Sequence, residues 1–414
     1  MSTPSLCGPR THRHTLATAL GAMVLSTWMG ASSAHAQASA PDRGVRTLHA
    51  QVADKALSLQ SLGANPHSPA VAVLLPHPAQ ESAHLKRLLA QVRQRPMDAD
   101  TAVKLALLNN PTLQVEMGHA GLDLTDASPA HNPAKRQLQE TVTVLSAQVL
   151  SAWVNAVAAQ QTVQSLQEAK ATAEAAGELS RRMTQVGNAS KLAQAKQQAQ
   201  VSEASIQLAR AQMQAFAAKE ALIQLLGLWG LDTQFELPTA LPELPERPTE
   251  LPNMEADVLN ARVALNLQTA QWQQKRRTPQ PASADALWDA MGDAASVRVA
   301  AVQARSEARE AYYRYRSTYD LAQHYQNEVL PLQQFIQDEL VLRYNGMLVS
   351  VFESLAQSQT LSQTKASATD AQRDFWLAHI GLAALLRGVS AERGSLAEGN
   401  SANRTTTASG SGGH

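Results

Sequence analysis

The chain of 414 residues contains one cysteine, Cys7, and only 4% aromatic residues. Because Cys7 lies in a segment that we expect to be removed on export, the mature chain is predicted to need no disulfide bond. The 35 basic residues balance the 35 acidic ones, so no charge excess indicates nucleic acid as a partner. Few aromatics beside abundant Ala, Gln and Leu favour long, closely packed helices over a compact α/β enzyme core.

Catalytic and metal-binding motifs are also missing. The sequence contains no G-x-S-x-G, no H-E-x-x-H, no glycine-rich phosphate loop and no dinucleotide fingerprint. The histidines His119, His131, His324 and His379 stand singly, without a paired spacing, and are predicted to lie at the surface or to cap helices. We therefore predict that the protein is not an enzyme and has neither a metal site nor a cofactor.

The N-terminal segment has the features of a secretory signal. Arg10 and Arg13 precede a short apolar run, and Ala34-His35-Ala36 follows it. This order is typical of a signal peptide cleaved before Gln37, so residues 1–36 are predicted to be removed. An uncleaved signal anchor is the alternative. No other apolar run approaches the roughly 20 residues that a membrane-spanning helix requires.

The remainder of the chain repeats itself at an offset of 159 residues, at which Trp153 coincides with Tyr312 and Gly187 with Gly346. Apolar or small residues recur in steps of three and four, which keeps them on one helix face, as in a coiled-coil seam. The pattern predicts an all-α fold of long antiparallel coiled-coil hairpins in two internal repeats, with little or no β-structure. The seam positions are Leu138, Val142, Leu145, Val149, Ala152, Ala156, Ala159, Val163 and Leu166 in the first repeat, and Val297, Ala301, Ala304, Ala308, Ala311, Tyr315, Thr318, Ala322 and Tyr325 in the second.

Helix caps and breakers define the first half of the mature chain. Residues 37–96 are predicted to form an irregular arm with one short helix, from Glu81 to Val92. Residues 97–236 form the first helical repeat, in which Asp98 or Asp100 caps the first helix and Pro111 breaks it. A long helix then runs to about Gln185 and a return helix to about Leu226, which makes an antiparallel hairpin.

The second half begins with a proline-rich strap, residues 237–253, whose five prolines forbid helix and favour an extended chain. The second helical repeat is predicted to span residues 254–388. Helix is expected from Met254 to about Lys275, and its long helix is predicted from Asp285 to about Arg343, with a kink near Pro331. The tail, residues 389–414, is rich in Ser, Asn, Thr and Gly and is predicted to be disordered.

Four local motifs accompany these elements: Ala106-Leu107-Leu108-Asn109-Asn110-Pro111, Leu225-Leu226-Gly227-Leu228-Trp229-Gly230, Arg343-Tyr344-Asn345-Gly346-Met347-Leu348 and Arg373-Asp374-Phe375-Trp376. Together with the signal, the duplicated hairpins and the strap, they resemble the TolC-type outer-membrane efflux proteins, in particular the branch often linked to heavy-metal export. The likeness covers about residues 79–388.

This resemblance implies a homotrimer whose helices form a TolC-like helical barrel, a tunnel that crosses the periplasm. It also implies a periplasmic adaptor (membrane fusion) protein and an inner-membrane pump as partners, and no nucleic acid. The hairpin tips would meet the adaptor or form the aperture, whereas generic helix turns are the alternative. The tip residues are Val186, Gly187, Asn188, Leu192, Arg343, Tyr344, Asn345, Gly346, Met347, Leu348, Val351 and Phe352.

The family places a pair of membrane strands between the first helix and the long helix of each repeat, and each strand takes about 9–11 residues with alternating apolar positions. The matching segments are Ala127 to Pro133, which is too short, and Arg276 to about Ser296, which is proline-rich and then helical in pattern. We therefore predict that the strands of the membrane barrel are missing.

Two functions remain open at this point. The first is a TolC-like component of a tripartite export system, located at the outer membrane and acting as a passive periplasmic conduit for small molecules or metal ions. The second is a soluble periplasmic coiled-coil protein, a relative without the barrel, which binds an adaptor or self-associates without transporting.

Overall fold

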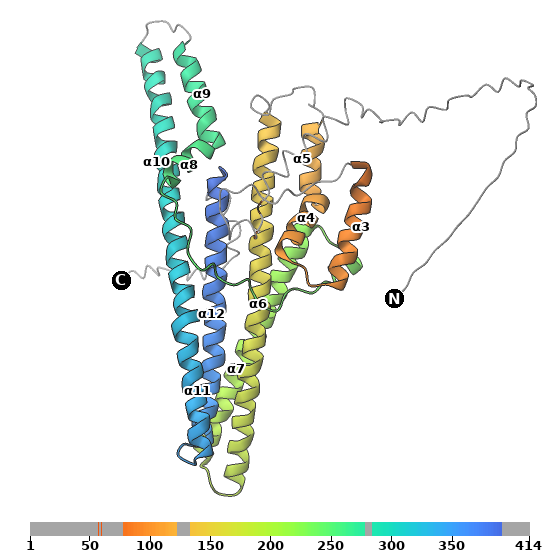
Figure 1. Cartoon of the computed structure of the whole chain (residues 1–414), viewed down its shortest axis with the longest axis vertical. Coiled ribbons are helices and arrows are strands. Elements are labelled where there is room, and N and C mark those ends of the chain that lie inside the picture. Colours follow the sequence, from red (N-terminus) through yellow and green to blue (C-terminus); the bar gives the residue numbers. More distant parts are fainter. Residues whose placement is uncertain (1–56, 58, 60–77, 122–132, 278–283, 391–414) are drawn as a thin grey trace, which may run out of the picture. The chain divides into compact units, whose positions relative to one another are not determined.

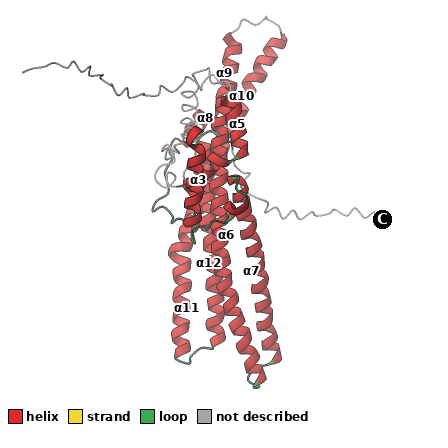
Figure 2. Cartoon of the chain, turned by 90° about the vertical axis from the view of Figure 1, so that its right-hand side faces the viewer, coloured by secondary structure: helices red, strands yellow, loops and turns green. Residues whose placement is uncertain are grey.

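The structure is a computed structural model, and all of its described regular elements are helical, with no strand among them (Figures 1 and 2). The predicted signal peptide and most of the predicted arm and tail lie outside the described residues. The described residues are 57, 59, 78–121, 133–277 and 284–390.

Two long helical hairpins make up most of the described chain (Figure 1). The first consists of α6 (Pro133–Gln185) and α7 (Lys191–Leu226). The long arm of the second is formed by α10 (Ala284–His324), the π-helical turn η2 (Tyr325–Val329) and α11 (Leu330–Asn345), and its return helix is α12 (Val351–Leu386). The helices of each hairpin contact one another, and α12 also packs on α6, which joins the two hairpins.

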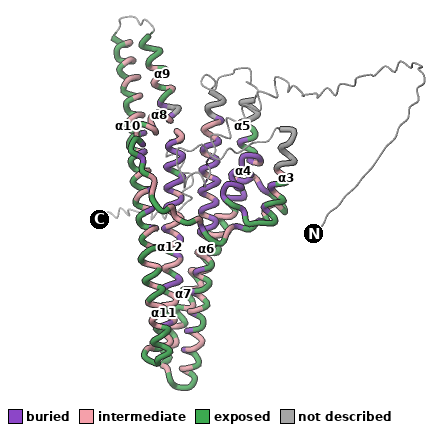
Figure 3. The backbone as a smooth tube through the Cα atoms, in the orientation of Figure 1, coloured by how far each residue is buried: buried purple, intermediate pink, exposed green. Residues whose placement is uncertain are grey.

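Shorter helices surround the ends of the hairpins that lie away from the tips. They are α3 (Pro78–Gln94), α4 (Ala99–Asn109), α5 (Pro111–Gly121), the 3-10 turn η1 (Gly230–Thr233), α8 (Met254–Ala261) and α9 (Val263–Arg277). A hydrophobic core joins α4, α6, α12 and the strap, and Trp153 in it donates from its indole N–H to the carbonyl of Met97. Figure 3 shows burial concentrated at this level and exposed residues at the hairpin tips.

The predicted helix breaks in the first repeat are present. Asp98 is the N-cap of α4, which ends at Asn109, and Pro111 begins α5. The side-chain amides of Asn109 and Asn110 donate to the carbonyls of residues 225–227, so the break is fastened to the end of α7. The backbone carbonyls left over at one helix end are thereby satisfied by another segment of the chain.

Two predicted boundaries are wrong. The helix expected from Met254 to Lys275 is divided at Arg262, whose ψ of 101° cannot continue an α-helix. The Arg262 side chain forms a largely buried ion pair with Glu307 of α10, which holds the break in place. The tail predicted to be disordered begins at residue 389, but Val389 is 2% exposed and belongs to the hydrophobic core, while residues 391–414 lie outside the described residues.

The two segments predicted to have lost membrane strands differ in what the structure describes. In the second, Arg276 and Arg277 end α9 and residues 284–296 belong to α10, so this part is helical. Residues 278–283 of the second segment and residues 127–132 of the first lie outside the described residues.

One part of α6, Leu138–Gln185, is long and apolar enough to cross a membrane by length and composition, which corrects the prediction that no such run exists. Its apolar window is mostly buried among other helices of the same chain. None of the predicted seam positions in either hairpin is exposed, so core packing accounts for this apolar character.

The burial patterns of the two long arms coincide at an offset of 159 residues before η2. Leu145, Val149 and Ala156 of α6 are buried, and so are the residues 159 positions later, which are Ala304, Ala308 and Tyr315.

After η2 the offset becomes 160, because α7 and α12 have 36 residues each and begin at residues 191 and 351. Buried positions of α6 then correspond to half-buried ones: Ser165 to Tyr325, Ala169 to Val329, Ala173 to Gln333, Ala176 to Ile336 and Ser180 to Leu340.

The π-turn accounts for the extra residue. Its hydrogen bonds reach one residue further than those of an α-helix, as when the Leu330 N–H donates to the Tyr325 carbonyl, so the turn accommodates one inserted residue. Pro331 explains its place, since proline has no N–H and its ring crowds the carbonyl four residues earlier. The interruption predicted near Pro331 is therefore a change of register.

Gly227 offers a test of how the end of α7 packs against the break between α4 and α5. It ends α7 with a φ of 64°, and a Cβ there would lie 2.8 Å from the Asn109 carbonyl oxygen. We expect Gly227→Ala to lower the free energy of unfolding by about 1–3 kcal/mol in urea titrations followed by circular dichroism. Gly292→Ala is the control, because nothing lies within 4 Å of its Cβ position. It should raise the free energy by up to about 1 kcal/mol, and equal effects at both sites would contradict the packing.

Candidate functional site

The first hairpin tip closes with a glycine in the left-handed conformation. Gly187 has a φ of 81°. Its N–H donates to the carbonyl of Thr184, and the Asn188 N–H donates to that of Met183, a pair of bonds that caps α6 in the Schellman arrangement. The Ser190 hydroxyl then accepts the Ala193 N–H and caps the start of α7.

The second tip closes with the same pair of hydrogen bonds, but a methionine takes the glycine's place. The N–H groups of Met347 and Leu348 make these bonds, and Met347 has a φ of 58°, the only positive value at a non-glycine among the described residues. Gly346 has an ordinary φ of −81°. The predicted pairing of Gly187 with Gly346 is thus wrong by one residue, because the π-turn has shifted the register.

Both tips expose large apolar side chains. Met347 is 94% exposed, Leu348 77%, Val186 72% and Leu192 67%. The polar tip residues and the glycines are exposed as well, whereas Val351 and Phe352 are half buried; the exposed ones are Gly187, Asn188, Arg343, Tyr344, Asn345 and Gly346. Clustered apolar exposure of this kind is typical of surfaces that bind another protein.

The two tips lie at the same end of the hairpins (Figure 1). Lys365 of α12 forms an ion pair of 3.3 Å with Glu168 of α6, and each residue is about five turns from its own tip. Beside the first tip, hydrogen bonds from Arg181 and Arg182 lower the pKa of Glu178 to about 2. The predicted tip residues therefore form two separate turns at one end of the molecule.

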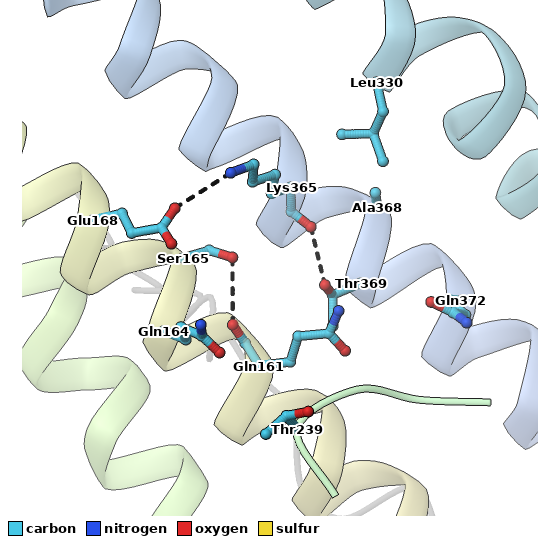
Figure 4. A pocket seen from close by; sticks show the side chains of 10 residues that line it. All are labelled: Gln161, Gln164, Ser165, Glu168, Thr239, Leu330, Lys365, Ala368, Thr369 and Gln372. Carbon is cyan, nitrogen blue, oxygen red and sulfur yellow. Dashed lines mark hydrogen bonds and ion pairs between the residues drawn. The ribbon is translucent and has the colours of Figure 1, made fainter. Parts of the chain in front are cut away.

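A polar cavity of about 460 Å³ lies where the two hairpins and the strap meet (Figure 4). Sequence reasoning missed it, because its walls come from α6, α12, the strap and the start of α11. The residues that line it are Gln161, Gln164, Ser165, Glu168, Thr239, Leu330, Lys365, Ala368, Thr369 and Gln372.

Most of the cavity's polar groups already have partners within the chain. Lys365 pairs with Glu168, the Thr369 hydroxyl donates to the Lys365 carbonyl and the Gln372 amide donates to the Pro242 carbonyl. No cluster of three or more His, Cys, Asp or Glu residues suited to a metal ion occurs in the described parts of the chain. The cavity is therefore a polar contact region between the two hairpins.

Two tyrosines of α10, Tyr315 and Tyr319, are core residues. Tyr315 and Tyr319 are 0% and 2% exposed, and Tyr313 points to solvent at 75%. Tyr315 packs on Phe375 of α12 with ring centroids 5.7 Å apart, and Tyr319 meets the same ring at 5.6 Å. These contacts hold α10 and α12 together.

The prediction that the histidines lie at the surface or cap helices is wrong for His379, which is 1% exposed within this aromatic cluster. Neither ring nitrogen has a hydrogen-bond partner among the described residues. Burial lowers its pKa to about 4, since the charged imidazolium is poorly solvated there. His324 is at the surface and lies 3.2 Å from Glu328, whereas the side chains of His119 and His131 are outside the described residues.

Two long hairpins, joined through α12 on α6 and connected by a proline-rich strap, give the described part of the chain an all-helical architecture. No protein-family model matches the sequence, and no curated protein matches it. Among solved structures the chain is similar to CusC, described in terms of transmembrane channel formation, at 14% identity and a TM-score of 0.50, covering 74% of this chain and 96% of that one.

The chain is also similar to the CmeC outer membrane channel of Campylobacter jejuni, at 11% identity and a TM-score of 0.46, covering 80% of this chain and 92% of that one. For the outer-membrane channel OprN the identity is 14%, the TM-score 0.47 and the coverage 80% and 96%. The similarity to CusC shows that this chain has the helical fold of the TolC-type efflux channels, as predicted.

Met347 provides a test of the tip geometry. A left-handed conformation costs a non-glycine residue about 1 kcal/mol, so Met347→Gly should raise the free energy of unfolding by up to that amount in denaturant titrations. Leu348→Gly is the matched control, because Leu348 is not among the residues with positive φ and should gain nothing. A gain at Leu348, or a loss at Met347, would show that the turn has another geometry.

Proposed function

We propose that this chain is a TolC-like component of a tripartite export system and forms a passive periplasmic conduit for small molecules or metal ions. The observation that carries the proposal is an uncovered coiled-coil seam on α7. Apolar or small residues follow one face of this helix in steps of three and four. All of them are exposed in the single chain: Leu192, Ala195, Ala199, Ser202, Ile206, Ala209, Met213 and Phe216.

The equivalent face of α12 has a partner. At the offset of 160 residues none of its positions is exposed, and α12 packs on α6 of the same chain. These positions are Phe352, Leu355, Gln359, Ser362, Ala366, Thr369, Arg373 and Trp376.

The return helix α12 packs on α6, the long helix of the other hairpin. By analogy, the return helix α7 should pack on the long arm of a second hairpin, which is formed by α10 and α11. Within the chain that arm packs on α12, so the partner of α7 has to come from a second copy. The arm has exposed apolar residues for this contact, among them Tyr313, Leu321, Leu332 and Phe335. A head-to-tail contact of this kind closes into a ring when its rotation allows. The TolC-type resemblance sets the number of copies at three.

The tips are the proposed docking surface for a periplasmic adaptor that links the ring to an inner-membrane pump. Met347, Leu348, Val186 and Leu192 would otherwise leave large apolar side chains in water. Export through the signal and an outer-membrane location complete this proposal, in which the chain has no catalytic role. The fold that this chain shares with CusC, a protein studied for transmembrane channel formation, supports the proposed conduit.

The second candidate is a periplasmic coiled-coil protein that binds an adaptor or self-associates without transporting. It is favoured by the helix over residues 284–296, where the resemblance implies a membrane strand. The two candidates differ in how the mature protein associates with membranes. Retention in the outer-membrane fraction after both carbonate and urea washes is expected for the first candidate. Complete release by either wash would instead support the second.

The seam itself is tested by a pair of neighbouring substitutions on α7. Met213→Glu places a charge on the proposed interface, whereas Gln214→Glu places the same charge beside it. Sedimentation velocity should show a trimer for the wild type and for Gln214→Glu. For Met213→Glu we expect the dissociation constant to rise at least about tenfold, which corresponds to roughly 1.4 kcal/mol. Equal behaviour of the two variants, or a monomeric wild type, would rule out this interface.

A further inference from the structure

Side chains of α10 and α12 hold the backbone of the proline-rich strap. On α12, the Trp376 indole N–H and the Gln372 amide both donate to the Pro242 carbonyl, at 3.1 and 2.6 Å. On α10, the Tyr319 hydroxyl lies 2.9 Å from the Pro245 carbonyl oxygen, to which it donates. The strap joins the first hairpin to the second, so these bonds fasten that connection to the second hairpin.

A fourth bond links the strap to the centre of the aromatic cluster. The Thr249 N–H donates to the Tyr315 hydroxyl at 2.9 Å. Thr249 is half buried and Tyr315 fully buried, so the exchange of this amide with solvent reports whether the strap is attached.

His379 lies among the rings that hold the strap. Its ring centroid is 4.9 Å from that of Tyr315, 5.6 Å from Phe375 and 5.9 Å from Trp376, on which it stacks at 15°. Tyr315 and Trp376 are therefore both walls of the histidine's cage and anchors of the strap. Of these three rings, Tyr315 and Trp376 bond to the strap, so displacing either one from the imidazole breaks a bond to the strap.

No neighbouring charge contributes to the lowered pKa of His379, which burial alone causes. On α6 no titratable residue occurs between Glu140 and Glu168. Titratable groups on the elements that pack around α12 include Tyr312, Tyr315, Arg316 and Tyr319 of α10, Glu243, Glu246, Arg247 and Glu250 of the strap, and Glu255 and Asp257 of α8. On α12 and its C-cap they include Asp370, Arg373, Asp374 and Arg387.

We propose that His379 makes the attachment of the strap sensitive to acid: its protonation opens the aromatic cage and thereby releases the strap from α10 and α12. Neither ring nitrogen of His379 has a hydrogen-bond acceptor among the described residues, and the side chain is 1% exposed in the closed cage, so the proton is bound in the open form. This device goes beyond the proposed conduit, and it holds for either candidate function.

The direction of the pH effect on strap attachment follows from the pKa of His379 in the closed and in the open cage. The pKa of His379 is about 4 in the closed cage, against an ordinary value of 6.5. The closed form therefore binds the proton more weakly, so attachment is strongest above pH 6.5 and weakens as the pH falls from 6.5 to about 4. Between pH 7.5 and pH 5 the ratio of open to closed strap should rise roughly thirtyfold.

Hydrogen exchange of the full mature chain, followed by mass spectrometry, tests this. After correction for the pH dependence of intrinsic exchange, the protection of the Thr249 amide, measured in a peptide that covers strap residues 246–251, should fall roughly thirtyfold from pH 7.5 to 5. Residues 149–157 of α6 are the internal reference and should lose much less protection. A strap whose protection does not change with pH would overturn the proposal.

Substitutions distinguish the effect of His379 protonation on the strap from the effect of lost packing in the aromatic cage. His379→Phe and His379→Gln remove the titrating group by two different side chains, and in either variant that folds the strap should lose its pH dependence. His324→Phe, at an exposed histidine, should keep the wild-type response. Tyr319→Phe removes a strap bond but keeps His379, so it should speed exchange at both pH values with an unchanged ratio. Retention of the wild-type ratio in both His379 variants would also overturn the proposal.

Discussion

The packing of α12 against α6 joins the two hairpins, and the other features of the molecule depend on it. It sets the two tips at one end, through contacts that include the pair between Lys365 and Glu168. It also encloses the polar cavity and brings the aromatic face of α12 to the level of the strap. Small and apolar residues at heptad spacing allow this close approach, because bulky side chains on both helices would hold them apart.

Much of this fold could be predicted from the sequence, because its signals are local. Heptad spacing defined the inward faces of the hairpins, Asp98 and Pro111 marked helix boundaries, and the prolines of the strap excluded helix. Boundaries failed where tertiary contacts decide them, as at Arg262, which leaves the helical conformation and pairs with Glu307. The cavity was unpredictable for a similar reason, since four separated segments build it.

The π-turn shows how one residue affects distant sites. An offset of 159 residues aligns the sequence before Pro331, and the same offset misplaces the second tip. Met347 then occupies the left-handed position that Gly187 fills in the first tip. His379 was misassigned on different grounds, because a lone histidine gives no sequence signal of burial. The burial comes from the rings of Tyr315, Phe375 and Trp376, brought in from α10 and from the preceding turn of α12.

The two hairpins differ most in the exposure of their return helices, since one face of α7 is exposed and the equivalent face of α12 is covered. This difference supports the proposed assembly. If α7 had evolved as the edge of a monomer, its outer face would be expected to carry charged residues of the kind found at solvated helix surfaces. Instead, that face repeats the spacing that α12 uses to pack on α6, and its Met213 and Phe216 are each 68% exposed. In the proposed assembly, a seam that matches an occupied one in length and phase is filled by a helix of the same shape. The long arm of a neighbouring copy meets that requirement, since it has the same helical geometry as α6 and free apolar residues of its own.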